Sequence, residues 1–150
     1  MGKLASQTRI KWEGDLFHLF LFPYQFSEIA PQVVHSVDLL AGSWGTVGSI
    51  ISWTYMFGGA KCVAKERIEA IDMKKKSITF KVIEGDLLKL YSEFKIICEM
   101  ESDGDGEDKV YKCALEYEKR SDEAPEPTVF MDFLLNFMKD IERSRRLVPN

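Results

Sequence analysis

The sequence predicts an α+β fold in which a seven-stranded, curved antiparallel sheet grips one long C-terminal helix, with two short helices after the first strand. Two observations lead to this prediction. Apolar residues recur at helical spacing over residues 128–146, and seven other segments alternate apolar and polar side chains. Each of these elements has a single apolar face to bury. A sheet that closes round a helix buries both faces at once.

The chain begins with a predicted strand over residues 3–11, in which apolar and polar side chains alternate. Residues 12–32 differ, because this segment is rich in aromatic side chains and is interrupted by glycine and proline. These interruptions leave room only for short helical turns, which are predicted at residues 15–20 and 27–33.

Six further strands are predicted from the same alternation, at residues 36–40, 49–57, 62–71, 77–83, 91–100 and 109–118. A glycine-rich run from Gly42 to Gly48 joins the first two of them. It lacks the Gly-Lys-Ser/Thr ending of a phosphate-binding loop and joins two strands, so its expected role is a tight backbone turn. Consecutive strands joined by hairpins imply an antiparallel sheet with one solvated face.

The predicted helix over residues 128–146 carries one apolar stripe, formed by Phe130, Phe133, Leu134, Phe137, Met138 and Ile141. Thr128 is the expected N-cap, and Asp132 places a carboxylate in the first turns. At the other end, arginines are expected to complement the last carbonyls: Arg143, Arg145 and Arg146. A stripe of such large side chains needs a broad apolar surface to lie on.

Composition limits the classes of function. The 150 residues are expected to form one domain, 1–150, and a net charge of -4 argues against nucleic acid as a partner. No apolar run reaches the roughly 18 residues of a membrane span, and the N-terminus has no apolar signal core. Cys62, Cys98 and Cys113 are widely spaced and are expected to be reduced and buried. We therefore expect a cytoplasmic protein without membrane insertion, as a monomer or weak dimer.

No residues indicate a metal or a cofactor. His18 and His35 stand alone, without a second ligand at metal spacing. The acidic loop at residues 102–108 has carboxylates near the spacing of a calcium loop, but it lacks the flanking helices and the distal glutamate. A solvated hairpin is the expected structure of this loop.

Four stretches of the chain carry a resemblance to a known family: Gly42-Ser-Trp-Gly-Thr-Val-Gly-Ser49, Val63-Ala-Lys-Glu-Arg-Ile-Glu-Ala-Ile-Asp72, Ile78-Thr-Phe-Lys-Val-Ile-Glu-Gly-Asp-Leu-Leu88, and Asp132-Phe-Leu-Leu-Asn136 before Lys139-Asp-Ile141. In this order they resemble the major latex proteins, a plant family of the birch-pollen-allergen superfamily with its START-like helix-grip fold. The resemblance implies two short helices that form a V and a large internal cavity that binds hydrophobic small molecules. Residues 12–32 depart from the family, because Leu19 to Phe22 is more apolar than the usual segment.

Glu66 is the most informative single residue. By alternation it shares the inward face of its strand with Ala64, Ile68 and Ala70. A carboxyl group buried in this way has a raised pKa and could act as a general base or as a hydrogen-bonding anchor for a ligand. The structural alternative is a carboxylate that is paired with Tyr55, Tyr111 or Tyr117, or that is hydrated at the end of the cavity.

The candidate ligand-binding residues are the inward side chains of the strands and the apolar stripe of the helix, where the resemblance places the roof of the cavity. They are Tyr55, Glu66, Ile78, Phe80, Val82, Phe94, Ile96, Tyr111, Leu115, Tyr117, Phe130, Phe133, Leu134, Phe137 and Met138. The tyrosine hydroxyls could orient a ligand inside an otherwise apolar space.

Carriage or sequestration of a hydrophobic small molecule is the expected function, and the resemblance implies a role in plant defence or stress. The alternative is a cavity-based enzyme of specialised metabolism that carries out a condensation or an isomerisation, with Glu66 as the catalytic residue. The strand lysines fall on the solvated face by alternation, which counts against a lysine-assisted reaction. A hormone receptor of the superfamily is a third reading, but its Ser-Gly-Leu-Pro-Ala gate is absent, and Gly85-Asp-Leu-Leu88 stands in that region.

Overall fold

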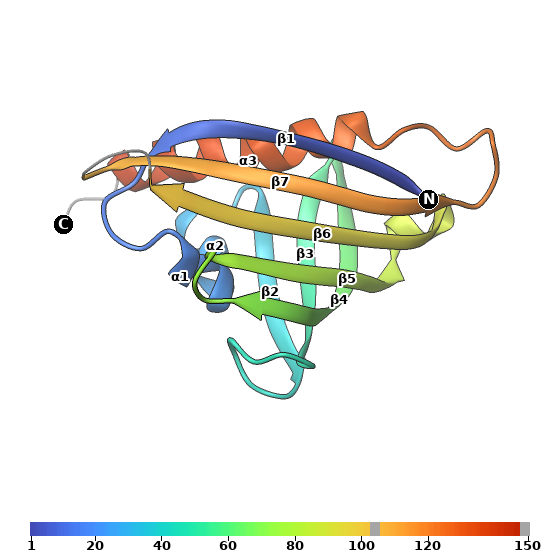
Figure 1. The fold of residues 1–150 in the computed structure, drawn as a ribbon, viewed down its shortest axis with the longest axis horizontal. Coiled ribbons are helices and arrows are strands. Elements are labelled where there is room, and N and C mark those ends of the chain that lie inside the picture. Colours follow the sequence, from blue (N-terminus) through green and yellow to red (C-terminus); the bar gives the residue numbers. More distant parts are fainter. Residues whose placement is uncertain (103–105, 148–150) are drawn as a thin grey trace.

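The computed structural model describes residues 1–102 and 106–147 (Figure 1). The strands are β1 (Gly2–Lys11), β2 (Val34–Ala41), β3 (Ile50–Phe57), β4 (Ala60–Asp72), β5 (Ser77–Gly85), β6 (Tyr91–Ser102) and β7 (Asp108–Lys119). The helices are α1 (Phe17–Leu21), α2 (Tyr24–Ile29), the 3-10 helix η1 (Asp86–Lys89) and α3 (Thr128–Leu147). The predicted fold class is confirmed.

The seven strands form one antiparallel sheet in the order β1-β7-β6-β5-β4-β3-β2. Strands β1, β7, β6 and β5 run side by side, and β2 and β3 run across their direction, with β4 between the two groups (Figure 1). α3 lies against β1 and β7 and also meets α2. The sheet therefore curves round the helix and leaves an interior between β3, β4 and the apolar face of α3.

The apolar stripe of α3 faces this interior as predicted. Met138 and Ile141 are fully buried, and Phe130 and Phe137 are nearly so. Burial of each such side chain contributes about 1.5–3 kcal/mol to stability. The N-terminus differs from the prediction, because Thr128 is already helical and the carbonyl of Pro127 accepts a hydrogen bond from the Met131 N–H at 3.0 Å.

The C-terminal arginines were predicted to complement the last carbonyls of the helix. Arg143 instead forms an ion pair with Asp140, which lies one turn earlier. The side chains of Arg145 and Arg146 lie outside the described residues, as do residues 103–105 of the acidic loop.

The two short helices exist, but their predicted bounds were wrong. α1 begins at Phe17, where the backbone N–H donates to the Asp15 carboxylate at 3.1 Å. α2 begins directly after Pro23, whose φ of -70° suits the first turn of a helix. The prediction treated Pro23 only as an interruption and placed the second helix too late. Phe26 of α2 is fully buried, so the apolar character of this segment serves the core.

A β-bulge in β4 corrects the predicted inward face of that strand. Ala64, Glu66 and Ile68 are buried as expected, but Ala70 is exposed. The register between β4 and β5 shifts between Ile68 and Ala70, so Ile71 pairs with Ile78 beyond the bulge. Such an extra residue reverses the alternation locally, which sequence pattern alone does not predict.

The short helix η1 was also not predicted, and it depends on Gly85. This residue has a φ of +134°, and a Cβ atom added there would lie 2.3 Å from the Val63 carbonyl oxygen. Only glycine allows so close an approach of the two backbones. The Asp86 side chain then accepts a hydrogen bond from the Val63 N–H at 2.9 Å, which ties η1 to β4.

The three cysteines are free thiols. Cys98 and Cys113 are buried as expected and face each other across β6 and β7, whereas Cys62 is only half-buried.

Candidate functional site

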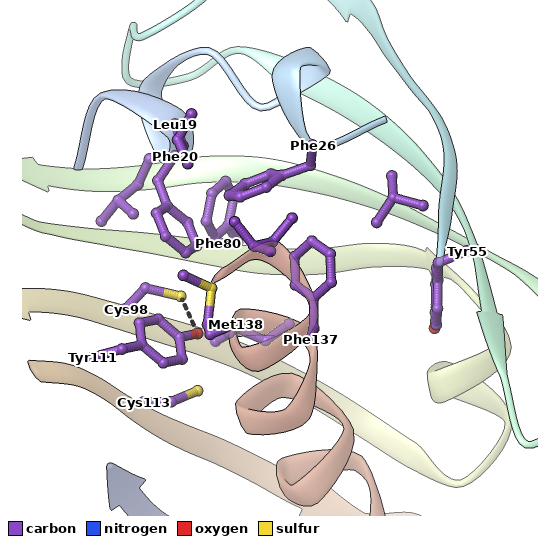
Figure 2. Close-up of a cluster of buried hydrophobic side chains, with 14 of the residues drawn as sticks. Leu19, Phe20, Phe26, Tyr55, Phe80, Cys98, Tyr111, Cys113, Phe137 and Met138 are labelled. Carbon is purple, nitrogen blue, oxygen red and sulfur yellow. Dashed lines mark hydrogen bonds between the residues drawn. The ribbon is translucent and has the colours of Figure 1, made fainter. Parts of the chain in front are cut away.

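An apolar pocket lies between the inner face of the sheet, α1 and α3. Fourteen residues line it: Phe20, Val34, Trp53, Tyr55, Ala64, Glu66, Phe80, Ile96, Cys98, Tyr111, Phe130, Phe133, Leu134 and Phe137. Figure 2 shows several of them, including Phe20, Phe80 and Phe137, pointing toward one another between the short helices, the sheet and α3. The pocket is therefore walled mainly by aromatic rings.

The pocket is smaller than the cavity that the resemblance implies. The space open to the centre of a water-sized molecule is about 70 Å³. Drug-sized ligands occupy pockets of roughly 300–1,000 Å³. A larger ligand would therefore have to move lining side chains, and the unbranched aromatic residues of α3 can do so by changing rotamer.

Nine of the fifteen candidate residues line this pocket: Tyr55, Glu66, Phe80, Ile96, Tyr111, Phe130, Phe133, Leu134 and Phe137. The other six are part of the surrounding core and do not reach the pocket: Ile78, Val82, Phe94, Leu115, Tyr117 and Met138. Their inward direction was predicted correctly, but alternation cannot tell a side chain that borders a hollow from one that is packed on all sides.

Five lining residues were not among the candidates: Phe20, Val34, Trp53, Ala64 and Cys98. For three of these a signal existed, because Trp53 alternates with Tyr55, Ala64 with Glu66, and Cys98 with Ile96. Phe20 could not be placed, since its position depends on the angle between α1 and the sheet.

Glu66 is the charged exception in the pocket wall. It lies in β4 between Ile51 of β3 and Val82 of β5, and only 5% of it is exposed. Burial raises the pKa of its carboxyl group from 4.5 to about 8, while the nearby Trp53 N–H acts in the opposite direction. At neutral pH the group is therefore mostly protonated and can both donate and accept a hydrogen bond.

The alternative in which Glu66 pairs with a tyrosine is not found among the described residues. The Tyr111 hydroxyl lies 3.3 Å from the Cys98 sulfur, an interaction drawn in Figure 2. The Tyr117 hydroxyl donates to Glu126, outside the pocket. Tyr55 borders the pocket, and burial raises the pKa of its hydroxyl, so this group stays protonated.

The glycine-rich loop serves as the predicted tight turn. The buried Ser49 hydroxyl donates to the Ser43 carbonyl at 2.7 Å and accepts from the Ser43 N–H at 3.0 Å. Gly42 has a φ of +85°, and a Cβ atom there would lie 2.3 Å from the Ser49 oxygen. The loop leads into β3 and not into a helix, so it lacks the geometry of a phosphate-binding loop.

Neither a metal site nor a membrane-spanning helix is found among the described residues, 1–102 and 106–147. No group of three or more His, Cys, Asp or Glu side chains among them is placed to hold a metal ion. No helix in the same part of the chain is long and apolar enough to cross a membrane.

Comparison with known proteins agrees with this architecture. Residues 1–145 match the model of the pathogenesis-related protein Bet v 1 family. MLP-like protein 34 of Arabidopsis thaliana is 41% identical over 144 residues, which cover 95% of this chain and 46% of that relative. The chain thus spans about half the length of this curated relative.

Solved structures show the same fold. The crystal structure of ginseng major latex-like protein 151 from Panax ginseng superposes with a TM-score of 0.87 at 38% identity, covering 95% of each chain. Norcoclaurine synthase from Thalictrum flavum, solved in complex with dopamine and hydroxybenzaldehyde, superposes with a TM-score of 0.72 over 99% of this chain and 88% of its own. At 16% identity, that second likeness concerns the fold alone.

Proposed function

The chain belongs to the pathogenesis-related protein Bet v 1 family, among its major latex proteins, and from this premise we propose that it carries or sequesters a hydrophobic small molecule in the pocket under α3. The observation that carries the proposal is the wall of the pocket, in which aromatic and aliphatic side chains far outnumber polar ones. Transfer of an apolar ligand from water to such a wall is favourable in proportion to the area buried.

We further propose that the protein acts in the cytoplasm, as a monomer or weak dimer, in plant defence or the response to stress. The support for the biological role is membership of the family. The reduced state of all three cysteines agrees with a cytoplasmic location.

An apolar fluorescent probe tests the binding function. Anilinonaphthalene sulfonate should bind the purified protein at micromolar concentration while near-ultraviolet circular dichroism reports native packing. Leu134→Trp places an indole in the pocket and should weaken probe binding about tenfold or more. Its loss of unfolding free energy should be smaller than the ~1–3 kcal/mol that an enlarged side chain costs in a close-packed core. Val129→Trp, on the exposed side of α3, is the matched control.

Two results would contradict the proposal. One is a natively packed protein that binds no probe. The other is a Leu134→Trp variant that is strongly destabilised while its affinity for the probe, per folded molecule, stays unchanged. Native mass spectrometry of protein purified from its own tissue would identify a ligand that copurifies.

A cavity-based enzyme is the alternative, because Glu66 is a buried carboxyl group with a pKa near neutrality. Among the described residues, however, no lysine, histidine or arginine lines the pocket to assist it. Glu66→Gln separates the two functions. A carrier should still bind ligand, whereas an enzyme that uses Glu66 as a base should lose turnover by about 10²-fold or more.

A further inference from the structure

The wall of the pocket formed by β3 and β4 carries an unsatisfied hydrogen-bond donor. The indole N–H of Trp53 is buried and has no hydrogen-bond partner, the one side-chain nitrogen or oxygen in this state among the described residues. Beside it is the Glu66 carboxyl group, whose pKa the Trp53 N–H acts to lower, although the two groups do not reach hydrogen-bond geometry. Both residues line the pocket.

The register of the sheet brings the two groups together. In the antiparallel pair β3–β4, Trp53 lies opposite Ala64, and Glu66 follows two residues later on the same face. Ala64, which neighbours both residues, has a small side chain and also lines the pocket. The indole itself is held by Phe26 and Phe80, whose ring centroids lie 6.0 Å and 6.1 Å from its own. The position of the N–H is therefore set by packing and not by a hydrogen bond.

A buried N–H without a partner is rare and unfavourable, because it has lost its hydrogen bond to water. We propose that Trp53 and Glu66 form a polar subsite that selects an uncharged, mainly apolar ligand carrying a single oxygen function, either a hydroxyl or a carbonyl group. This inference rests on the proposed binding function and adds the chemical class of the ligand.

The hydrogen-bonding capacity of the two groups favours oxygen. A hydroxyl oxygen accepts from Trp53 and donates its proton to Glu66, and a carbonyl oxygen accepts from both when Glu66 is protonated. An ammonium group only donates, so it would leave the Trp53 N–H unsatisfied. An anionic group at this subsite would find no cationic side chain among the described lining residues, so it would not replace the oxygen between Trp53 and Glu66.

Other titratable groups line the same pocket as Glu66, but their raised pKa values keep them protonated between pH 7 and pH 9. Tyr55 on β3, Cys98 on β6 and Tyr111 on β7 all have raised pKa values: burial is the main cause for the tyrosines, and hydrogen bonding with Cys113 for Cys98. Cys113 has a lowered pKa because of the hydrogen bond with Cys98, but it does not line the pocket. The described lining residues of β5, α1 and α3 do not titrate.

Four ligands with one bicyclic skeleton test the inference: indane, 1-indanol, 1-indanone and 1-aminoindane, with affinities measured by calorimetry at pH 7 and pH 9. We expect 1-indanol and 1-indanone to bind about tenfold or more tightly than indane at pH 7, and 1-aminoindane to gain no such advantage. Between pH 7 and pH 9, ionisation of Glu66 should reduce the affinity of 1-indanone relative to indane about tenfold. The affinity of 1-indanol relative to indane should stay unchanged.

Two variants and one spectrum assign the effect to these residues. Trp53→Phe should reduce the advantage of both oxygen ligands over indane, whereas Trp44→Phe makes the same chemical change outside the pocket and should not. Glu66→Gln should make ketone binding independent of pH. In wild-type protein, the Trp53 indole N–H resonance should shift downfield with 1-indanol but not with indane, a readout that requires no variant.

The outcomes separate this inference from the binding function. If indane and the oxygen ligands bind equally well, or if 1-aminoindane binds most tightly, the polar subsite is refuted while the apolar pocket stands. If none of the four ligands binds and the fluorescent probe also fails, the proposed function itself is refuted. An oxygen advantage that survives Trp53→Phe and leaves the indole resonance unmoved would also overturn the assignment.

Discussion

Replacement of Glu66 by glutamine should make the protein more stable, and increasingly so as the pH rises. The carboxyl group titrates at 4.5 when exposed and at about 8 in the folded protein, because burial disfavours its charge. A group whose pKa is raised by folding binds its proton more tightly in the native state, so stability falls as the pH rises between these two values. Below pH 4.5 and above pH 8, Glu66 should add no further dependence on pH.

The size of the effect follows from the two pKa values. At about 1.4 kcal/mol per pH unit, the interval from 4.5 to about 8 corresponds to about 5 kcal/mol. Any water that enters the pocket beside Glu66 would solvate the carboxylate and lower this cost. We therefore expect the gain in unfolding free energy of Glu66→Gln over wild type to grow by about 2–3 kcal/mol from pH 5 to pH 8.

Urea unfolding at pH 5, 6, 7, 8 and 9 measures this difference for wild type and variant. Glu118→Gln, which makes the same change on an exposed part of β7, is the matched control. A difference between Glu66→Gln and wild type that stays constant from pH 5 to pH 9 would mean that Glu66 is hydrated in the folded protein. That result would refute the buried carboxyl group on which this reasoning depends.

Three further substitutions test the packing around the site by urea unfolding. Phe137→Ala should cost roughly 3 kcal/mol, the low end for a buried ring, because one side of Phe137 borders the pocket. A loss of about 5 kcal/mol or more would mean that the ring is packed on all sides. Gly85→Ala should cost more than the ~1–2 kcal/mol of left-handed strain expected for Gly59→Ala, because of the two added Cβ atoms only the one at Gly85 meets a carbonyl oxygen. Equal losses of unfolding free energy would contradict this contact. Ser49→Ala should cost about 1–3 kcal/mol by removing a buried hydroxyl that bonds twice to the β2–β3 loop, and a loss below 0.5 kcal/mol would mean that the loop does not depend on it.

The strands and the long helix could be predicted because their signals are periodic and extend over many residues. The inward faces of β5, β6 and β7 followed from alternation, and α3 followed from one stripe. The failures involve single local events. The bulge between Ile68 and Ala70 and the start of α2 at Tyr24 each shift an element by one to three residues, and no periodic signal records them.

The candidate site was predictable in its chemistry but not in its geometry. Glu66 was identified because a charged residue interrupts an apolar face. The unsatisfied N–H of Trp53 was not, since its position depends on packing against Phe26, which lies in a different element. The size of the pocket also could not be predicted from the sequence. It is the small difference between the volume that the sheet and the helix enclose and the volume that the side chains fill.

The way α3 crosses β1 has a consequence for self-association. β1 is an edge strand, and an unpaired edge can recruit a strand from another molecule and start aggregation. Here the side chains of α3 occupy part of that edge: the Lys11 N–H donates to Glu142, and the Arg9 carbonyl accepts from Lys139. The helix that roofs the pocket thus also blocks strand addition at this end of β1, so loosening α3 to admit a large ligand would expose backbone that can pair with a second chain.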